Sequence, residues 1–374
     1  MSENERLHVL MAAGPVSHGP RSLYTLEMSR GLLELGHDVL ILTPRVDMPI
    51  SRRYQWIPIK AEPALARPII RSLRLGVLFS ELEDWRPDVL HVQSLRAVPI
   101  GNLVASHLGL PTVVSAHASG ERLWGLRPLV RNGAHVIALT EAIREDLVNR
   151  GRVPKESIRV IPIGVADRAS GPPVSWLDHG CRRIPVVATI AELEHNCGVQ
   201  FLLEAAQRVL KTGFDAEFLV IGSGREKRPL RRLAEGLGIR SRVSFSDSAP
   251  DIIQQLSAID ILVVTRLDEA HRPITLEAMM QGKPVVAFGV GAIFDAIEEE
   301  TAGLLVEKGD SEGLARAITR LIAKPDFAMR LASRAQEVVR TRFSLPRALD
   351  DTVNCFRDAI ARVSSLVSER AFHE

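Results

Sequence analysis

The chain has 374 residues, which is too long for one small domain and long enough for two or three compact units. Its 47 Lys and Arg residues against 45 Asp and Glu give a formal net charge of +2, too balanced for a protein that coats nucleic acid. An apolar fraction of 46% with 25% charged residues excludes a disordered chain.

Short runs rich in β-branched residues alternate with longer amphipathic segments in the first half of the chain. One amphipathic segment, residues 24–36, has leucines at helical spacing and closes on Gly36. Strands that alternate with helices predict a parallel sheet with crossover helices. The strand-like runs cover residues 7–13, 38–43, 88–93, 111–117, 135–140 and 158–163.

The alternation breaks at residues 166–183, an aperiodic stretch with a Gly-Pro-Pro sequence that we interpret as a linker. A second series of strand-like runs then predicts a second doubly wound α/β domain. We place the domains at residues 1–165 and 184–342, and expect the terminal segment 343–374, with a helix over 343–363, to cross back to the first domain. The second series covers residues 184–191, 216–222, 242–246, 259–265, 283–289 and 303–309.

The cysteines and the apolar runs indicate the cellular compartment of the protein. Cys181, Cys197 and Cys355 are scattered, which fits neither a disulfide framework nor a metal site with paired ligands. The first residues resemble a strand and not a signal peptide, and no apolar run approaches the roughly 18 residues of a transmembrane helix. We expect a cytoplasmic protein without a metal, in which any membrane contact is peripheral and on the inner face.

Two glycine-containing loops follow predicted strands. Gly14 and Gly19 precede a predicted helix, where free backbone amides suit an anion, although an ordinary tight turn explains them equally well. Gly222 and Gly224 follow a strand of the second domain in the same way. Neither loop has the spacing of a dinucleotide fingerprint, which argues against a nicotinamide cofactor.

Two carboxylates lie in residues 265–297. Glu269 follows a predicted strand, at the edge where open α/β sheets bind ligands, and Glu277 opens a predicted helix eight residues later. Carboxylates in this place suit the hydroxyls of a sugar or a ribose. A carboxylate at a helix start is also a common dipole-stabilising residue.

Seven segments in order resemble glycosyltransferase family 4, retaining enzymes of the GT-B architecture. The resemblance covers nearly the full chain and implies two Rossmann-like α/β domains that face a central cleft. It implies a nucleotide-diphosphate sugar as donor, a carbohydrate or lipid-linked acceptor, and no cofactor, as in polysaccharide or glycolipid biosynthesis. The segments are residues 18–39, 88–94, 112–117, 136–151, 160–165, 265–297 and 303–318.

The resemblance also implies roles for single residues. Glu277 would contact the nucleotide ribose, and Glu269 the transferred sugar. His117, at the end of a strand, would reach the sugar from the first domain; the alternative is a histidine that simply closes a strand. The other implied donor-binding residues are Gly19 in the phosphate-facing loop, Ile274 and Thr275 through their backbone amides, Gly198 and Gly222.

The chain departs from the family at the donor phosphates. The family usually has an arginine, and five residues later a lysine, where this chain has Glu192 and Cys197. Loss of these cations removes charge stabilisation from the leaving diphosphate. Arg272 stands where the family usually has glycine, and a guanidinium there offers a replacement cation or simply fills the pocket. If it is the replacement, Arg272→Ala should abolish donor binding.

These departures leave three hypotheses. The first is an active retaining glycosyltransferase. The second is a catalytically silent homologue that acts as a binding or scaffolding subunit, which Glu192 and Cys197 favour and which Glu269, Glu277 and His117 oppose. The third, which fits less well, is a nucleotide-sugar epimerase with the same two-domain architecture.

Residues 45–74 contain seven basic residues against Asp47 and Glu62, with Ile and Leu interleaved. Such a patch suits anionic lipid and would present a lipid-linked acceptor, and it equally suits a solvated helix face.

Overall fold

The computed structural model describes residues 6–17, 20–47, 50, 52–65, 71–123, 125–167, 183–247, 252–267, 273–291 and 293–371. For residues 20, 21, 71–74, 252–254 and 366–371 it describes the backbone alone. The chain divides into two compact units, one of residues 1–164 with 345–374 and the other of residues 165–344. Within the predicted linker, residues 168–182 lie outside the described residues.

The first unit contains a parallel sheet of seven strands in the order β3-β2-β1-β4-β5-β6-β7. The order reverses between β1 and β4, which makes the carboxyl ends of these two strands a topological switch point. The predicted runs correspond to six of the strands, and β3 at the sheet edge was missed. The strands are β1 (His8–Ala12), β2 (Asp38–Thr43), β3 (Ile59–Ala61), β4 (Val89–Val92), β5 (Thr112–Ala116), β6 (His135–Ala138) and β7 (Ile158–Val160).

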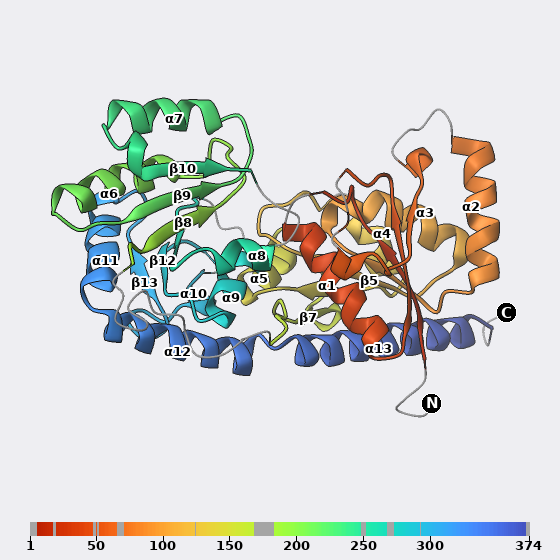
Figure 1. Ribbon diagram of the computed structural model, residues 1–374. Helices are drawn as coiled ribbons and strands as arrows, with labels where there is room; N and C mark the ends of the chain where they lie inside the picture. Colours follow the sequence, from red (N-terminus) through yellow and green to blue (C-terminus); the bar gives the residue numbers. More distant parts are fainter. Residues whose placement is uncertain are drawn as a thin grey trace. The chain divides into compact units, whose positions relative to one another are not determined.

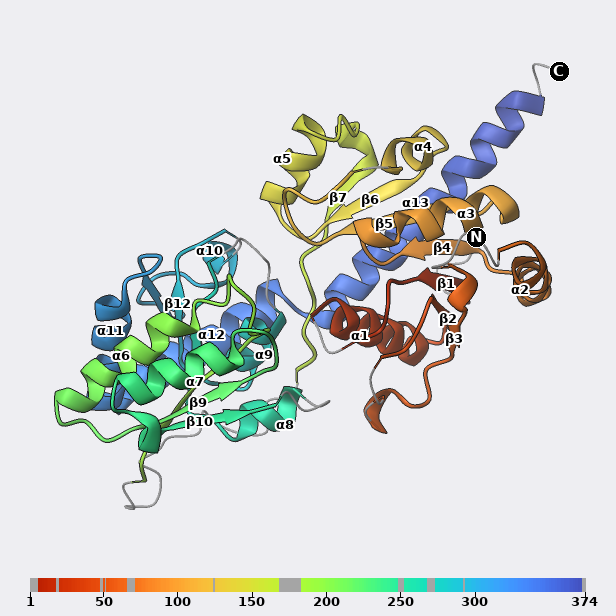
Figure 2. The ribbon, with the colours of Figure 1, turned by 90° about the horizontal axis from the view of Figure 1, so that it is seen from above.

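Helices cover this sheet. Helix α13 contacts β4, β5 and α1, and Figure 2 shows it beside the two strands. Helix α3 also contacts β4 and β5, and α2 and α4 pack on α3. Gly31 of α1 allows α13 to approach, because a Cβ there would stand 2.4 Å from Leu349 Cδ1. The helices are α1 (Pro20–Glu34), α2 (Arg71–Trp85), α3 (Val98–Leu108), α4 (Leu126–Arg131), α5 (Glu141–Asn149) and α13 (Leu345–Ala371).

The second unit repeats this design with six parallel strands in the order β10-β9-β8-β11-β12-β13. The order reverses between β8 and β11, which places a second switch point there. Strands rich in Val, Ile and Leu and buried on both faces are typical of a parallel sheet covered by helices. The strands are β8 (Val186–Ile190), β9 (Glu217–Ile221), β10 (Val243–Ser246), β11 (Ile261–Val264), β12 (Val285–Phe288) and β13 (Leu304–Val306).

Two layers of helices enclose the second sheet. Figure 1 shows α6 and α11 on one side, where they pack on each other, and α8 and α9 on the opposite side. Helix α12 packs on α9, and α7 packs on α6. The helices are α6 (Val199–Lys211), α7 (Lys227–Gly236), α8 (Ile252–Ser257), α9 (Pro273–Met280), α10 (Ile293–Ala296), α11 (Ser311–Ala323) and α12 (Pro325–Arg342).

The basic segment at residues 45–74 is not one amphipathic helix. It contains two short 3-10 helices, at residues 52–54 and 63–65, and strand β3 between them. Three of its basic residues form ion pairs: Arg45 with Asp47, Arg53 with Glu27, and Lys60 with Glu81. Among the residues that the structure describes, no helix is long and apolar enough to cross a membrane.

Candidate active site

The residues that follow β8 and β11 lie against each other at the switch point of the second unit. Thr265 Oγ1 donates a hydrogen bond of 2.8 Å to the carbonyl oxygen of Cys197. The amide of Leu267 donates one of 3.1 Å to the carbonyl oxygen of Asn196. Because both segments leave the carboxyl edge of the sheet, they form a floor where this fold class binds ligands.

Gly198 makes this close contact possible. It precedes α6 with a φ of +68°, and a Cβ on it would stand 1.8 Å from the carbonyl oxygen of Thr265. Both the left-handed backbone and the missing side chain require glycine. Gly198 therefore fixes the path of the loop. Its role in donor binding stays a prediction.

Gly222 has a similar role in the loop after the neighbouring strand, β9. Its φ is +152°, and a Cβ there would stand 1.9 Å from the carbonyl oxygen of Ala191. The amide of Leu193 donates to the carbonyl oxygen of Ser223, and the amide of Glu226 donates to that of Leu193, each at 2.9 Å. The loop after β9 is thus bound to the loop after β8. Its contact with a donor stays a prediction.

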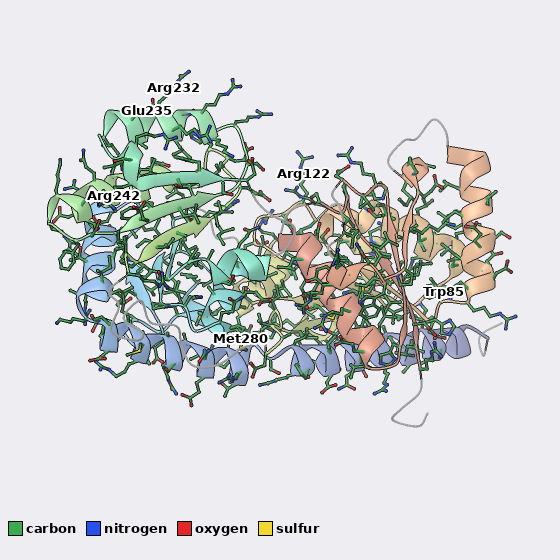
Figure 3. The ribbon with its side chains drawn as sticks, in the orientation of Figure 1. Trp85, Arg122, Arg232, Glu235, Arg242 and Met280 are labelled. Atoms are coloured by element: carbon green, nitrogen blue, oxygen red, sulfur yellow. The ribbon has the colours of Figure 1, made fainter. Side chains whose placement is uncertain are left out.

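Helix α9 carries three of the predicted donor-binding residues, Ile274, Thr275 and Glu277, all buried. The sequence predicted a helix that begins at Glu277. The helix instead begins at Pro273, so Glu277 lies in its second turn. Pro273 costs no hydrogen bond at this position, because the first amides of a helix have no partner inside it. At the other end, Gln336 of α12 donates to the carbonyl oxygen of Met280, a residue labelled in Figure 3.

Thr275 holds an unsatisfied polar group inside this helix. It is 1% exposed, and its Oγ1 has no hydrogen-bond partner among the described residues. A buried hydroxyl without a partner costs about 1–3 kcal/mol. A ligand oxygen at the start of α9 is one way to remove this cost.

The two residues that replace the family's cations differ in their surroundings. Glu192 is exposed in the loop after β8. Cys197 is 2% exposed and packs in the hydrophobic core with Val199 and Leu202. Burial raises the pKa of the Cys197 thiol, with opposite smaller effects from Glu226 and Arg266. The residue at the usual lysine position is therefore a neutral core side chain.

His117 belongs to the first unit, directly after β5. Its Nε2 donates a hydrogen bond of 2.8 Å to the backbone carbonyl oxygen of Gln93, and its ring meets Tyr24 edge-on at 4.7 Å. Gln93 itself follows β4, and its backbone N–H donates a hydrogen bond of 2.9 Å to the carbonyl oxygen of Ala12. His117 is 9% exposed, so the structure fixes one ring nitrogen and the ring plane at the switch point of the first sheet.

A buried polar layer supports His117 from below. His91 of β4 and Ser115 of β5 share a hydrogen bond of 2.9 Å, and Ser115 also bonds the Tyr24 hydroxyl. Burial raises the pKa of Tyr24 to about 12, so the hydroxyl stays protonated. Burial first, and the neighbouring His117 second, lower the pKa of His91 to about 3, so its ring is neutral at physiological pH.

Three of the predicted site residues, Gly19, Glu269 and Arg272, lie outside the described residues. Their predicted roles stay predictions. Among the residues that the structure does describe, no group of three or more His, Cys, Asp or Glu side chains is placed to hold a metal ion.

Sequence reasoning missed three residues at or near these strand ends: Gln93 and Arg266, and Tyr24 of α1, which contacts His117. Gln93 and Arg266 had a usable signal, because Gln93 ends the predicted strand 88–93 and Arg266 directly follows the predicted strand 259–265. Tyr24 had none, since it lies in helix α1 and only the tertiary structure brings its ring against His117.

Two protein families match the chain and together cover more than half of it. Residues 22–168 match the family described as Glycosyltransferase Family 4, and residues 184–324 match Glycosyl transferases group 1. The two matches fall on the two units, one on each sheet.

Individual proteins agree with these families. Alpha-D-kanosaminyltransferase of Streptomyces kanamyceticus is 25% identical over 68% of this chain and 72% of its own length. D-inositol 3-phosphate glycosyltransferase of Salinispora tropica is 26% identical over 94% of this chain and 84% of its own. The fold resembles that of Anabaena HepE, solved in complex with UDP-glucose, with a TM-score of 0.73, 19% identity, and coverage of 97% and 100%. The chain is therefore a glycosyltransferase of the family 4 type with the GT-B fold.

Proposed function

We propose that this glycosyltransferase moves a sugar from a nucleotide-diphosphate donor to a hydroxyl of a carbohydrate-type acceptor, with retention of the anomeric configuration. The arrangement at the switch point of the six-stranded sheet carries the proposal. There the loops after β8, β9 and β11 are bound to one another, and α9 follows with Thr275 and Glu277 buried in its first two turns.

The donor assignment rests on this arrangement and on a neighbour of the same fold. Anabaena HepE was solved with UDP-glucose, with UDP, and with UDP and glucose. A nucleoside diphosphate needs hydrogen-bond donors for its phosphates and acceptors for its ribose hydroxyls. The first turn of α9 offers the former, and Glu277 offers the latter.

The acceptor assignment draws on the relatives. One is named for D-inositol 3-phosphate, and another for 2-deoxystreptamine. These names favour a polyhydroxylated ring as acceptor. A lipid-linked acceptor, with a peripheral membrane contact through residues 45–74, is the second possibility. Flotation with vesicles that contain anionic phospholipid tests it. Vesicle binding that does not depend on the fraction of anionic phospholipid would contradict it.

In this proposal residues of both units act in a single transfer step. The acceptor oxygen forms a bond with the anomeric carbon, and the bond from that carbon to the β-phosphate oxygen breaks. The electron pair stays on the phosphate oxygen, which takes the proton of the acceptor hydroxyl. Glu277 holds the ribose, His117 and Glu269 hold the sugar, and donors at the start of α9 stabilise the charge on the leaving phosphate.

A panel of nucleotide-diphosphate sugars tests the proposal. Thermal shifts with UDP-, GDP-, ADP- and dTDP-sugars should show stabilisation by one base class, because a ligand that binds only the folded state raises its stability. The preferred donor, incubated with a panel of cyclitols and monosaccharides, should release its nucleoside diphosphate. NMR of the product should show the donor's anomeric configuration. Inversion would contradict the retaining assignment, and no shift with any donor would contradict the donor class.

A further inference from the structure

Arg266 is fixed beside the position at which the chain lacks its expected lysine. The residues on either side of it, Thr265 and Leu267, are hydrogen-bonded to the carbonyl oxygens of Cys197 and Asn196, at 2.8 Å and 3.1 Å. Gly198 lies against the carbonyl oxygen of Thr265. Three contacts in a row therefore hold the backbone of Arg266 along the loop after β8.

This loop has no cation of its own. Residues 191–198 contain Glu192 and Glu194, both exposed, and neither Lys nor Arg. Arg266 is partly buried, and its charge acts on the Cys197 thiol against that of Glu226. The backbone contacts keep residue 266 beside this loop, so its guanidinium brings positive charge to a segment that has neither Lys nor Arg.

A second observation at the same edge favours a ligand that offers hydrogen-bond acceptors. Thr275 lies two residues after Pro273 in the first turn of α9, and α9 packs on β11, the strand that Arg266 follows. The Thr275 Oγ1 atom is buried without a partner among the described residues. A phosphate oxygen is an acceptor that satisfies such a hydroxyl and pairs with a guanidinium through two hydrogen bonds.

We propose that Arg266, together with the Thr275 hydroxyl, binds the diphosphate of the donor and takes the place of the absent cations at positions 192 and 197. This inference rests on the proposed function and assigns a further residue to the donor site. Arg266 neutralises the charge that collects on the β-phosphate oxygen as its bond to the sugar breaks.

Titration calorimetry of charge variants tests the assignment. The probes are UDP, GDP, ADP and dTDP, followed by the monophosphate of whichever diphosphate binds most tightly to the wild type. Arg266→Gln should weaken diphosphate binding by about tenfold to 100-fold, because hydrogen bonds to charged groups are lost. Arg266→Lys should weaken diphosphate binding less. In Arg266→Gln, the affinity for the monophosphate should fall less than the affinity for the diphosphate.

A matched control is Arg232→Gln, which removes the same charge from an exposed residue on the outer side of α7, labelled in Figure 3. Its diphosphate affinity should stay within about twofold of the wild type. Glu192→Arg in the Arg266→Gln background should restore part of the lost affinity, which a purely structural role of Arg266 does not predict. Unfolding curves of each variant show whether the fold is intact.

The outcomes separate this inference from the proposed function. If the wild type binds a nucleoside diphosphate and folded Arg266→Gln binds it equally well, Arg266 is not the phosphate cation, and the donor class stands. If Glu192→Arg gives no recovery, the role of Arg266 is structural. If the wild type binds none of the diphosphates, the proposed function is wrong, and this inference falls with it.

Discussion

The carbonyl oxygen of Thr265 lies so close to Gly198 that a Cβ on residue 198 would stand 1.8 Å from it. The obstacle is backbone, which cannot rotate away as a flexible side chain does. Gly198→Ala should therefore separate the two loops or unfold the region, with a loss of at least about 2 kcal/mol in the free energy of unfolding. Donor affinity should fall with it, as measured by denaturant unfolding and nucleotide titration.

Gly213 is the matched control for this change. Its φ of +86° is also left-handed, but a Cβ there has nothing within 4 Å. Gly213→Ala carries the backbone strain without the collision, so it should cost about 1 kcal/mol and leave nucleotide binding unchanged. Equal losses for the two variants would show that the contact with Thr265 is not what demands glycine at position 198.

Glu277→Gln should weaken binding of the donor nucleotide by about tenfold or more, because a neutral amide forms weaker hydrogen bonds to ribose hydroxyls than a carboxylate does. Titration with a nucleoside diphosphate and with its 2′,3′-dideoxy analogue locates the contact. The penalty of the substitution should disappear with the analogue. A penalty that persists would place Glu277 elsewhere than at the ribose. Glu235→Gln, an exposed change on α7, is the control and should have no effect.

His117→Ala should distinguish the sugar from the nucleotide. His117 lies in the unit that does not contain α9, and its predicted partner is the transferred sugar. The variant should bind the nucleoside diphosphate normally, bind the complete sugar donor less tightly, and lose about 100-fold in kcat/KM. His107→Ala, a half-exposed histidine of the same unit, is the control. A loss of nucleoside diphosphate affinity in His117→Ala would contradict the assignment.

The strand pattern was enough to predict both sheets, because buried parallel strands are short apolar runs between amphipathic helices. Strand β3 escaped detection because it has three residues with Lys60 at its centre, so it forms no apolar run. The start of α9 was also misplaced. A helix buried on all sides lacks the amphipathic period that marks helix ends.

The candidate site was less accessible to sequence reasoning. Glycine loops and carboxylates at strand ends can be identified in one dimension. The contact between residues 265–267 and 196–198 depends on β11 pairing with β8, across some 70 residues of chain. Cys197 is another example, because the sequence shows the missing lysine but not that the thiol packs in the core.

The last prediction concerns acid stability and rests on His91. Its ring is fully buried between Ser115 and Phe356, and burial, with a smaller effect of His117, lowers its pKa to about 3. In the unfolded chain a histidine takes up a proton near pH 6.5. Between about pH 6.5 and 3 the unfolded state therefore binds a proton that the folded state excludes. Stability should fall with pH in this window by up to about 1.4 kcal/mol per unit.

His91→Gln removes this titration and keeps an amide that can bond Ser115. Its free energy of unfolding should decline less steeply than that of the wild type from pH 6.5 downward, while above pH 7 the two curves should run parallel. Tryptophan fluorescence suits the measurement, because three of the four tryptophans in the sequence fall within the range of the first unit, which contains His91. The acid slopes of His37 and His135, whose pKa values burial also lowers, are common to both proteins and cancel in the comparison. Parallel curves below pH 6.5 would mean that the buried ring takes up its proton without loss of the fold.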